Sequence, residues 1–158
     1  MSTQTTHSGG TISGASLYVA GYEKNAQGYR VAVLWKNGVV QCLCNGGSDS
    51  EASSVFVAGN DVYVAGYEEN VHGNGMATVW KNGLATHLTS GGTVAAAYSV
   101  FVAGNDVYVA GFETNAQGNR VAMLWKNGSC QRLSDGSSDA GAESVWVLTR
   151  TEGFLGTF

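Results

Sequence analysis

The stretch DVYVAGYEENVHGNGMATVWKNG, residues 61–83, decides the fold of this chain because the chain carries it three times. The other two copies begin at Leu17 and Val107, each 45 residues from Val62, with no insertion or deletion between copies. A second stretch, SVFVAGNDVYVAG at 54–66, recurs unchanged at 99–111. Repetition at a fixed period of this length indicates a repeat protein whose units stack on one another.

Each unit carries the signals of short antiparallel strands. In the first copy, two apolar runs rich in β-formers, at 17–23 and 31–35, flank a loop with Asn and Gly. An Asn-Gly pair follows the second run, and such pairs form tight type I′ hairpin turns because both residues accept positive φ. A weaker run at 39–44 and the constant run at 54–58 and 99–103 supply the remaining predicted strands.

Four antiparallel strands in about 45 residues are typical of a β-propeller blade. A β-solenoid is the main alternative, but its rungs are usually shorter and pair in parallel, whereas the Asn-Gly hairpins favour antiparallel blades. Gly and β-branched residues interrupt every segment with helical potential. We therefore predict an all-β chain of three four-stranded propeller blades, without a regular helix longer than one turn.

The repeat also predicts the boundaries of the units. Residues 1–10 form a polar leader, and blade 1 covers 11–53 with a degenerate inner strand. Blades 2 and 3 cover 54–98 and 99–143, and an extra inner strand with a tail covers 144–158. The chain therefore has three good copies of every strand, permuted by one.

Three blades are too few for a closed propeller, which has about 4–8. Two chains related by a twofold axis would complete a six-bladed ring, so the expected partner is a second copy of this chain. We predict that the extra strand becomes the inner strand of the partner's first blade, beside residues 17–23 of that chain. This strand consists of Ser144, Val145, Trp146, Val147 and Leu148. In the alternative, residues 11–13 fill that place within their own chain and the C-terminal tail frays.

Composition and charge bear on the class of partner. Charged residues are only 13% of the chain and the net charge is −4, with no basic cluster. We expect no nucleic-acid partner, because phosphate binding needs a footprint of Lys and Arg. We expect no membrane partner, because no apolar run reaches the roughly 20 residues of a membrane span. Residues 1–10 lack the features of a secretory signal, and Cys42, Cys44 and Cys130 are expected to be free thiols, so a cytoplasmic location is the default expectation.

The combination of VYVAGYE, WKNG and SVFVAGN resembles the blades of uncharacterised bacterial β-propeller repeat proteins. The resemblance covers Leu17 to about Val147, which is nearly the whole of the predicted folded region. It implies the propeller fold and a serial array of units, and it implies no activity. The close similarity of the copies indicates recent amplification or an engineered array.

Three tryptophans, Trp35, Trp80 and Trp125, occupy the same position of each unit. They could stack on sugars, but large aromatics in the middle of a blade more often pack blade against blade, with the indole N–H bonded to a backbone carbonyl. We predict the packing role.

Catalytic and metal-binding constellations are not indicated. His87 with Cys42 and Cys44 superficially suggests a metal site, but equivalent positions on separate blades lie beyond ligand distance. The Glu that ends the second strand of each unit is interpreted as a charge at the blade rim. Near-identical blades supply like groups, whereas catalysis usually needs unlike groups with separated pKa values. We therefore expect no enzyme, no cofactor and no metal.

Two functions are consistent with these patterns. The first is a non-enzymatic structural or scaffold protein that assembles as a symmetric oligomer. The alternative is a ligand-binding module of the carbohydrate type, which would use the variable loops of one face. The residues predicted for ligand contact are Asn25, Tyr29, Arg30, Asn70, Asn74, Asn115, Asn119 and Arg120.

Overall fold

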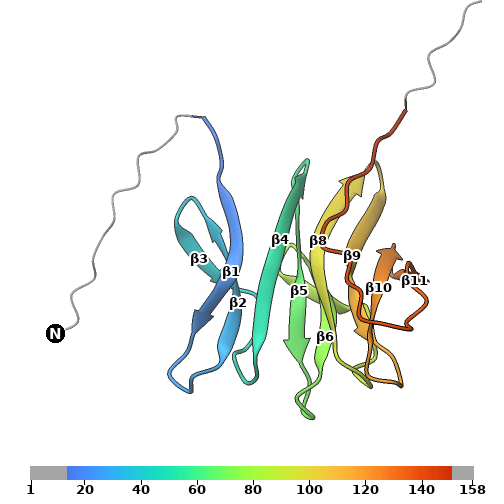
Figure 1. Cartoon of the computed structure of the whole chain (residues 1–158). Helices are drawn as coiled ribbons and strands as arrows, with labels where there is room; N and C mark the ends of the chain where they lie inside the picture. The colour runs from blue at the N-terminus through green and yellow to red at the C-terminus, as the bar shows by residue number, and fades with distance from the viewer. Residues whose placement is uncertain (1–13, 151–158) are drawn as a thin grey trace, which may run out of the picture.

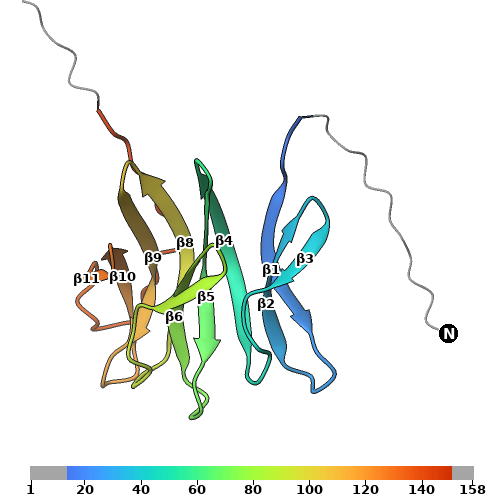
Figure 2. The same ribbon diagram turned by 180° about the vertical axis from the view of Figure 1, so that it is seen from behind.

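The computed structural model describes residues 14–150, which form β-strands and no helix (Figure 1). The strands form three antiparallel sheets that stand side by side in chain order, as both views show (Figures 1 and 2). The expectation of an all-β chain is therefore confirmed for this part of the sequence. No helix among these residues could cross a membrane. The predicted leader at 1–10 and the final residues 151–158 lie outside the described range.

Each sheet is a meander in which consecutive strands are neighbours. The first sheet, β1-β2-β3, comprises Tyr18–Lys24, Arg30–Lys36 and Val39–Cys42. The second, β4-β5-β6-β7, comprises Ser50–Ala58, Asp61–Glu69, Gly75–Lys81 and Leu84–His87. The third, β8-β9-β10-β11, comprises Ala95–Ala103, Asp106–Thr114, Arg120–Lys126 and Ser129–Arg132. The register of β8 against β9 equals that of β4 against β5, shifted by 45 residues.

The Asn-Gly hairpins form as predicted. Asn37, Asn82 and Asn127 have φ values of 51°, 51° and 49°, and the glycine after each has positive φ as well. Two successive positive φ values are the requirement of the type I′ turn. Each Asn side chain also accepts a hydrogen bond of 2.8–2.9 Å from a backbone N–H of the neighbouring strand. The turn residue therefore both sets the backbone conformation and ties the hairpin to the sheet.

β4 and β8 are the first strands of the second and third sheets, the strands that the blade pattern predicts as the inner ones. Both begin four residues earlier than predicted. The sequence placed their starts at Ser54 and Ser99, whereas the structure places them at Ser50 and Ala95. A β-bulge between Ala52 and Ser54, repeated one unit later, interrupts the pairing without ending it. A bulge breaks the alternation of apolar and polar residues, so the first half of each strand resembles a loop in the sequence.

Gly66 explains why the bulge is accommodated. A Cβ atom at this position would collide with the carbonyl oxygen of Glu51 on β4, and one at Gly111 would collide with the carbonyl of Ala96 on β8. Only glycine allows the two backbones to approach this closely. The bulged strands β4 and β8 therefore require the glycine that ends YVAG in the second and third units, Gly66 and Gly111.

The first sheet has three described strands instead of the four that the blade pattern predicts. In the alternative arrangement residues 11–13 would supply the fourth strand of this unit, and they lie outside the described range. The outer strands are also shorter than predicted, since β3 ends at Cys42 and not at residue 44. Leu43 leaves the strand but keeps one bond, which its N–H donates to the carbonyl of Ala32 over 2.9 Å.

The second sheet lies between the other two and packs on both. Toward the first sheet it presents Ala52, Val64 and Trp80, which form a cluster with buried residues such as Ala32 and Leu34. Toward the third sheet it presents a different set that includes Tyr63, Ala65, Ala77 and Val79. Because both faces of its middle strands are covered, β6 is a run of buried residues without alternation.

Candidate functional site

The end of the described chain lies against the third sheet. Residues 139–148, which we call the C-terminal segment, form no regular strand, yet they make regular contacts (Figure 1). The Arg120 N–H donates to a carboxylate oxygen of Asp139 over 2.8 Å, and the Ala140 N–H donates to the Arg120 carbonyl over 2.9 Å. Further along, the Ala142 N–H donates to the carbonyl of Gly111 over 3.1 Å.

The last contacts of the C-terminal segment repeat those between the second and third sheets. The Val145 N–H donates to the Ser99 hydroxyl over 3.1 Å, and the Trp146 ring lies 5.9 Å from that of Phe101. One unit earlier, the Val100 N–H donates to the Ser54 hydroxyl over 3.2 Å, and the Phe101 ring lies 4.7 Å from that of Phe56. The C-terminal segment therefore takes the position on the third sheet that β8 takes on the second.

The first sheet lacks a neighbour on one face, whereas the third sheet carries the additional C-terminal segment. Val19 on β1 is 44% exposed, whereas its equivalents Val64 and Val109 are 1% and 2% exposed. Trp35 is only partly buried, whereas Trp80 and Trp125 are fully buried. Val19 and Trp35 are opposite each other in the β1–β2 pairing, so they mark one uncovered apolar face. This face corresponds to the one that the second and third sheets turn toward the preceding sheet.

The outer side of the third sheet carries only the C-terminal segment and is otherwise uncovered. Leu133 follows β11 and is 52% exposed, whereas Leu43, its equivalent after β3, is 7% exposed because the second sheet covers it. Beyond the third sheet, Trp146 and Leu148 are also largely exposed. The first and third sheets stand at the two ends of the row (Figures 1 and 2). Each of these end sheets therefore has an outward face with exposed apolar side chains.

The asparagines predicted for ligand contact are used inside their own loops. The Asn70 amide N–H donates to the carbonyl of Gly91 over 2.9 Å, and its oxygen accepts bonds from the backbone N–H groups of His72 and Asn74. Asn25 and Asn115 make the same set of bonds in the other units. The Asn74 amide donates to the same Gly91 carbonyl as Asn70, and Asn119 shares its acceptor with Asn115 in the same way. These side chains fasten the loop after the second strand to the loop before the next inner strand.

Of the remaining predicted contact residues, Tyr29 is exposed to solvent and the two arginines lie over aromatic rings. Tyr29 is exposed at a loop tip. Arg30 pairs with Glu51 of the second sheet over 2.6 Å and lies over the Tyr22 ring at 5.3 Å. Arg120 lies over the Phe112 ring at 4.4 Å. The hydrogen bond to Glu51 raises the pKa of Arg30.

The tryptophans pack between sheets but differ from expectation in one respect. The indole nitrogens of Trp80 and Trp125 are buried and have no hydrogen-bond partner among the described residues. The predicted bond to a backbone carbonyl is therefore wrong for both.

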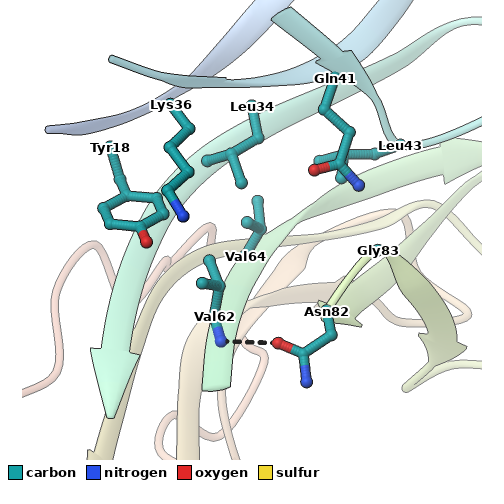
Figure 3. Close-up of a pocket in the computed structure, with 9 residues that line it drawn as sticks. All are labelled: Tyr18, Leu34, Lys36, Gln41, Leu43, Val62, Val64, Asn82 and Gly83. Atoms are coloured by element: carbon teal, nitrogen blue, oxygen red, sulfur yellow. Dashed lines mark hydrogen bonds between the residues drawn. The ribbon is translucent and has the colours of Figure 1, made fainter. Parts of the chain in front are cut away.

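A cavity of about 220 Å³ lies between the first and second sheets (Figure 3). Tyr18 and Leu34 approach it from the first sheet, and Val62 and Val64 approach it from the second (Figure 3). Asn82 lies at its edge and accepts the Val62 N–H over 2.9 Å. The cluster of buried residues between the second and third sheets is the equivalent contact one unit later. There, Phe56 and Ala58 of β4 pack against the cluster.

A second cavity, of about 310 Å³, lies between the second and third sheets near the loops. Tyr67, Glu69 and Gly75 line it from the second sheet, and Tyr98 and Arg120 line it from the third. No sequence prediction named this cavity. The signal was available in the repeat, since Gly75 stands where the other units have Arg30 and Arg120.

Cys44, Ser50, Glu68 and His87 line one small pocket, but they form no metal site in the part of the chain that the structure describes. No group of three His, Cys, Asp or Glu side chains there could hold a metal ion. His87 pairs with Glu68 over 2.8 Å, and all three cysteines are free. Cys44 contacts the Ser50 hydroxyl over 2.8 Å, which gives the thiol a structural neighbour. Comparison of the chain with protein-family models and with curated proteins gives no match.

Proposed function

We propose that this chain is a non-enzymatic β-propeller module that assembles with a second copy of itself into a closed six-bladed ring. In this proposal each sheet is a blade, and the C-terminal segment supplies the inner strand that the partner's first blade lacks. The observation that carries the proposal is the position of Val145 and Trp146. They contact Ser99 and Phe101 as β8 contacts β4, while no described strand pairs with their other side.

The pairing of β4 with β5 predicts how the exchanged strand would lie. Val55 is opposite Val64 in that pairing, and Phe56 is opposite Tyr63. Shifted to the chain ends, the same register places Val145 opposite the partner's Val19. It places Trp146 opposite the partner's Tyr18, beside the cavity between the first and second sheets.

Uncovered apolar surface explains why a second copy is the occupant. A propeller blade is apolar on both faces, and an open row leaves two such faces in water, which favours association. In the second and third sheets, the face equivalent to that of Val19 and Trp35 packs on the preceding sheet. In the first sheet this face is exposed, and so is Leu133 on the outward face of the third sheet. Two copies placed head to tail bury both faces twice, and a ring of six blades is within the range of about 4–8 that propellers adopt.

The mass of the protein in solution tests this proposal. Light scattering should give a single species of twice the 16.4 kDa of one chain. The mass should stay constant on dilution through the micromolar range, because each closed ring has two equivalent contacts. A monodisperse species of 16.4 kDa would contradict the proposal, and so would a continuous series of larger assemblies.

Truncation separates ring closure from strand exchange. A chain that ends after Glu143 lacks the exchanged strand and should lose most of its dimer or much of its thermal stability. The matched control ends after Arg150, which removes only residues 151–158 and should leave the dimer intact. An unchanged dimer after the first truncation would overturn the exchange even where the ring is correct.

Of the eight residues predicted for ligand contact, the ligand-binding alternative keeps Arg120, which lines a cavity between the second and third sheets. Five of its eight candidates are the asparagines whose amide groups bond within the loops. The observation that favours this alternative is the cavity of about 310 Å³ between the second and third sheets. It lies at the lower end of the range of about 300–1,000 Å³ that small-molecule sites occupy.

A further inference from the structure

One repeat position differs between the three units in a way that creates a cavity. Arg30 and Arg120 begin the second strand of their hairpins, and the middle unit has Gly75 there. The Arg30 guanidinium lies 5.3 Å from the centre of the Tyr22 ring, and the Arg120 guanidinium lies 4.4 Å from that of Phe112. The ring in the equivalent position of the middle unit is Tyr67, and glycine supplies no guanidinium to cover it.

The space above Tyr67 is part of the cavity of about 310 Å³. A Cβ atom added to Gly75 would lie 3.0 Å from the Ala95 carbonyl oxygen and 3.4 Å from the Tyr67 ring, so an arginine side chain there would start at the cavity after a small shift of the Ala95 backbone. Gly75 has no positive φ, so its backbone does not require glycine. The repeat therefore shows what fills this space in the two other units, and it is a cation stacked on an aromatic ring.

The wall of the cavity offers a carboxylate to such a cation. Glu69 lines it and makes no ion pair with any residue in the range 14–150. Burial raises the pKa of the Glu69 carboxyl, the Asp49 carboxylate raises it further, and the Arg30 guanidinium opposes both. Glu51 also lines the cavity, but its charge is already balanced by Arg30. Of the two carboxyl groups that line the cavity, Glu69 is therefore the one without an ion pair among residues 14–150.

We propose that this cavity binds a small organic cation that carries a guanidinium group. The guanidinium stacks on Tyr67 as those of Arg30 and Arg120 stack on their rings, and it bonds to the Glu69 carboxylate. Arg120 lines the opposite side of the cavity, so the far end of the ligand is neutral or anionic. A free amino acid with a guanidinium side chain meets both conditions. The site lies within one chain and does not depend on the assembly proposed above.

Titration calorimetry with L-arginine tests the proposal, with L-citrulline as the neutral analogue of the same shape. L-arginine should bind at a stoichiometry of one per chain, and L-citrulline should bind at least tenfold more weakly, since it lacks the charge that both Tyr67 and Glu69 recognise. A neutral pyranoside serves as a third ligand. No binding of L-arginine at 10 mM, on the order of the weakest measurable affinity for so small a ligand, would overturn the proposal. Equal binding of the two amino acids, or preferred binding of the sugar, would overturn it too.

Variants locate the site. Gly75→Arg restores the residue found at the two equivalent positions, so the chain's own guanidinium should fill the cavity and abolish binding. The Ala95 carbonyl must move by a few tenths of an ångström to admit the new Cβ, so the melting temperature is measured on the same sample to show that the fold is kept. Glu69→Gln should weaken binding at least fivefold, and Tyr67→Leu should weaken it similarly. Tyr22→Leu is the matched control, because the Tyr22 ring is already covered by Arg30. Undiminished binding to Gly75→Arg would overturn the assignment. Light scattering of the same samples reports assembly separately, so failure of one proposal is distinguishable from failure of the other.

Discussion

Val145 and Ser99 are joined by a 3.1 Å hydrogen bond from the backbone N–H of the first to the hydroxyl oxygen of the second. The pair repeats Val100 and Ser54 one unit earlier, at 3.2 Å. The same contact thus places an inner strand on the sheet before it, whether or not the strand has a partner of its own. For the C-terminal segment this means that contacts within a single chain already determine its position on the third sheet.

Loss of this bond should loosen the C-terminal segment selectively. Ser99→Ala removes a hydroxyl acceptor worth about 1 kcal/mol, so amide exchange at 144–147 should accelerate about fivefold. Ser54→Ala, the matched control, removes the equivalent acceptor for β8 and should leave exchange in the C-terminal segment unchanged. Equal protection of the segment in the two variants would show that Ser99 does not hold it.

The buried indole of Trp80 should matter through its volume and not through its N–H group. Trp80→Ala should lower the free energy of unfolding by about 3–5 kcal/mol, because it empties the centre of the contact between the first two sheets. Trp80→Phe should cost much less, since the nitrogen it removes has no hydrogen-bond partner among the described residues. Chemical denaturation measures both. If the two variants were equally unstable, the indole nitrogen would have a partner such as a buried water molecule.

Trp35 should act on assembly, in contrast to Trp80. It lies on the uncovered face of the first sheet, so in the proposed ring it packs against the partner's third sheet. Trp35→Ala should weaken dimerisation at least about tenfold, as loss of a central interface aromatic typically does. Sedimentation velocity over a dilution series gives the dissociation constant. A variant that unfolds more easily but dimerises as before would place Trp35 in the core of a single chain.

Acid should weaken the second and third hairpins through two equivalent carboxylates. The hydrogen bond from Asn82, and after it the Lys81 ammonium, lowers the pKa of Asp61, and Asn127 and Lys126 lower that of Asp106 in the same way. A lowered folded-state pKa means stability that is fully present above the unfolded value of about 3.9 and is lost as pH falls through the folded one. The melting temperature should therefore decrease less steeply between about pH 5 and pH 2 when both residues are asparagine. An unchanged slope would show that these ion pairs do not stabilise the fold.

The sequence predicted the strands and turns well because each unit repeats local signals. Asn82-Gly83 alone determines a hairpin, and its three copies occur where expected. The early start of β4 could not be predicted, because the bulge after Ala52 depends on a close approach to Gly66 that only the folded sheet reveals.

The candidate site was less accessible to sequence reasoning. Asn70 and its equivalents are polar, variable in context and located in loops, which is also the pattern of ligand contacts. The structure shows that their amides bond across two loops, a relationship between residues about 20 positions apart. The cavity at Gly75 is visible in the sequence only as a missing arginine, and its meaning depends on the ring of Tyr67 beside it.

Disulfide trapping tests the exchanged strand most directly. In a background with Cys42, Cys44 and Cys130 changed to serine, Val19→Cys and Val145→Cys place one thiol on β1 and one on the C-terminal segment. β1 and the C-terminal segment lie at opposite ends of the row of sheets within one chain (Figure 1), whereas a disulfide needs Cα atoms about 4.4–6.8 Å apart. Oxidation should convert the protein to one covalent dimer with no free thiol. A product that stays monomeric, or a ladder of higher oligomers, would contradict the closed exchange between two copies.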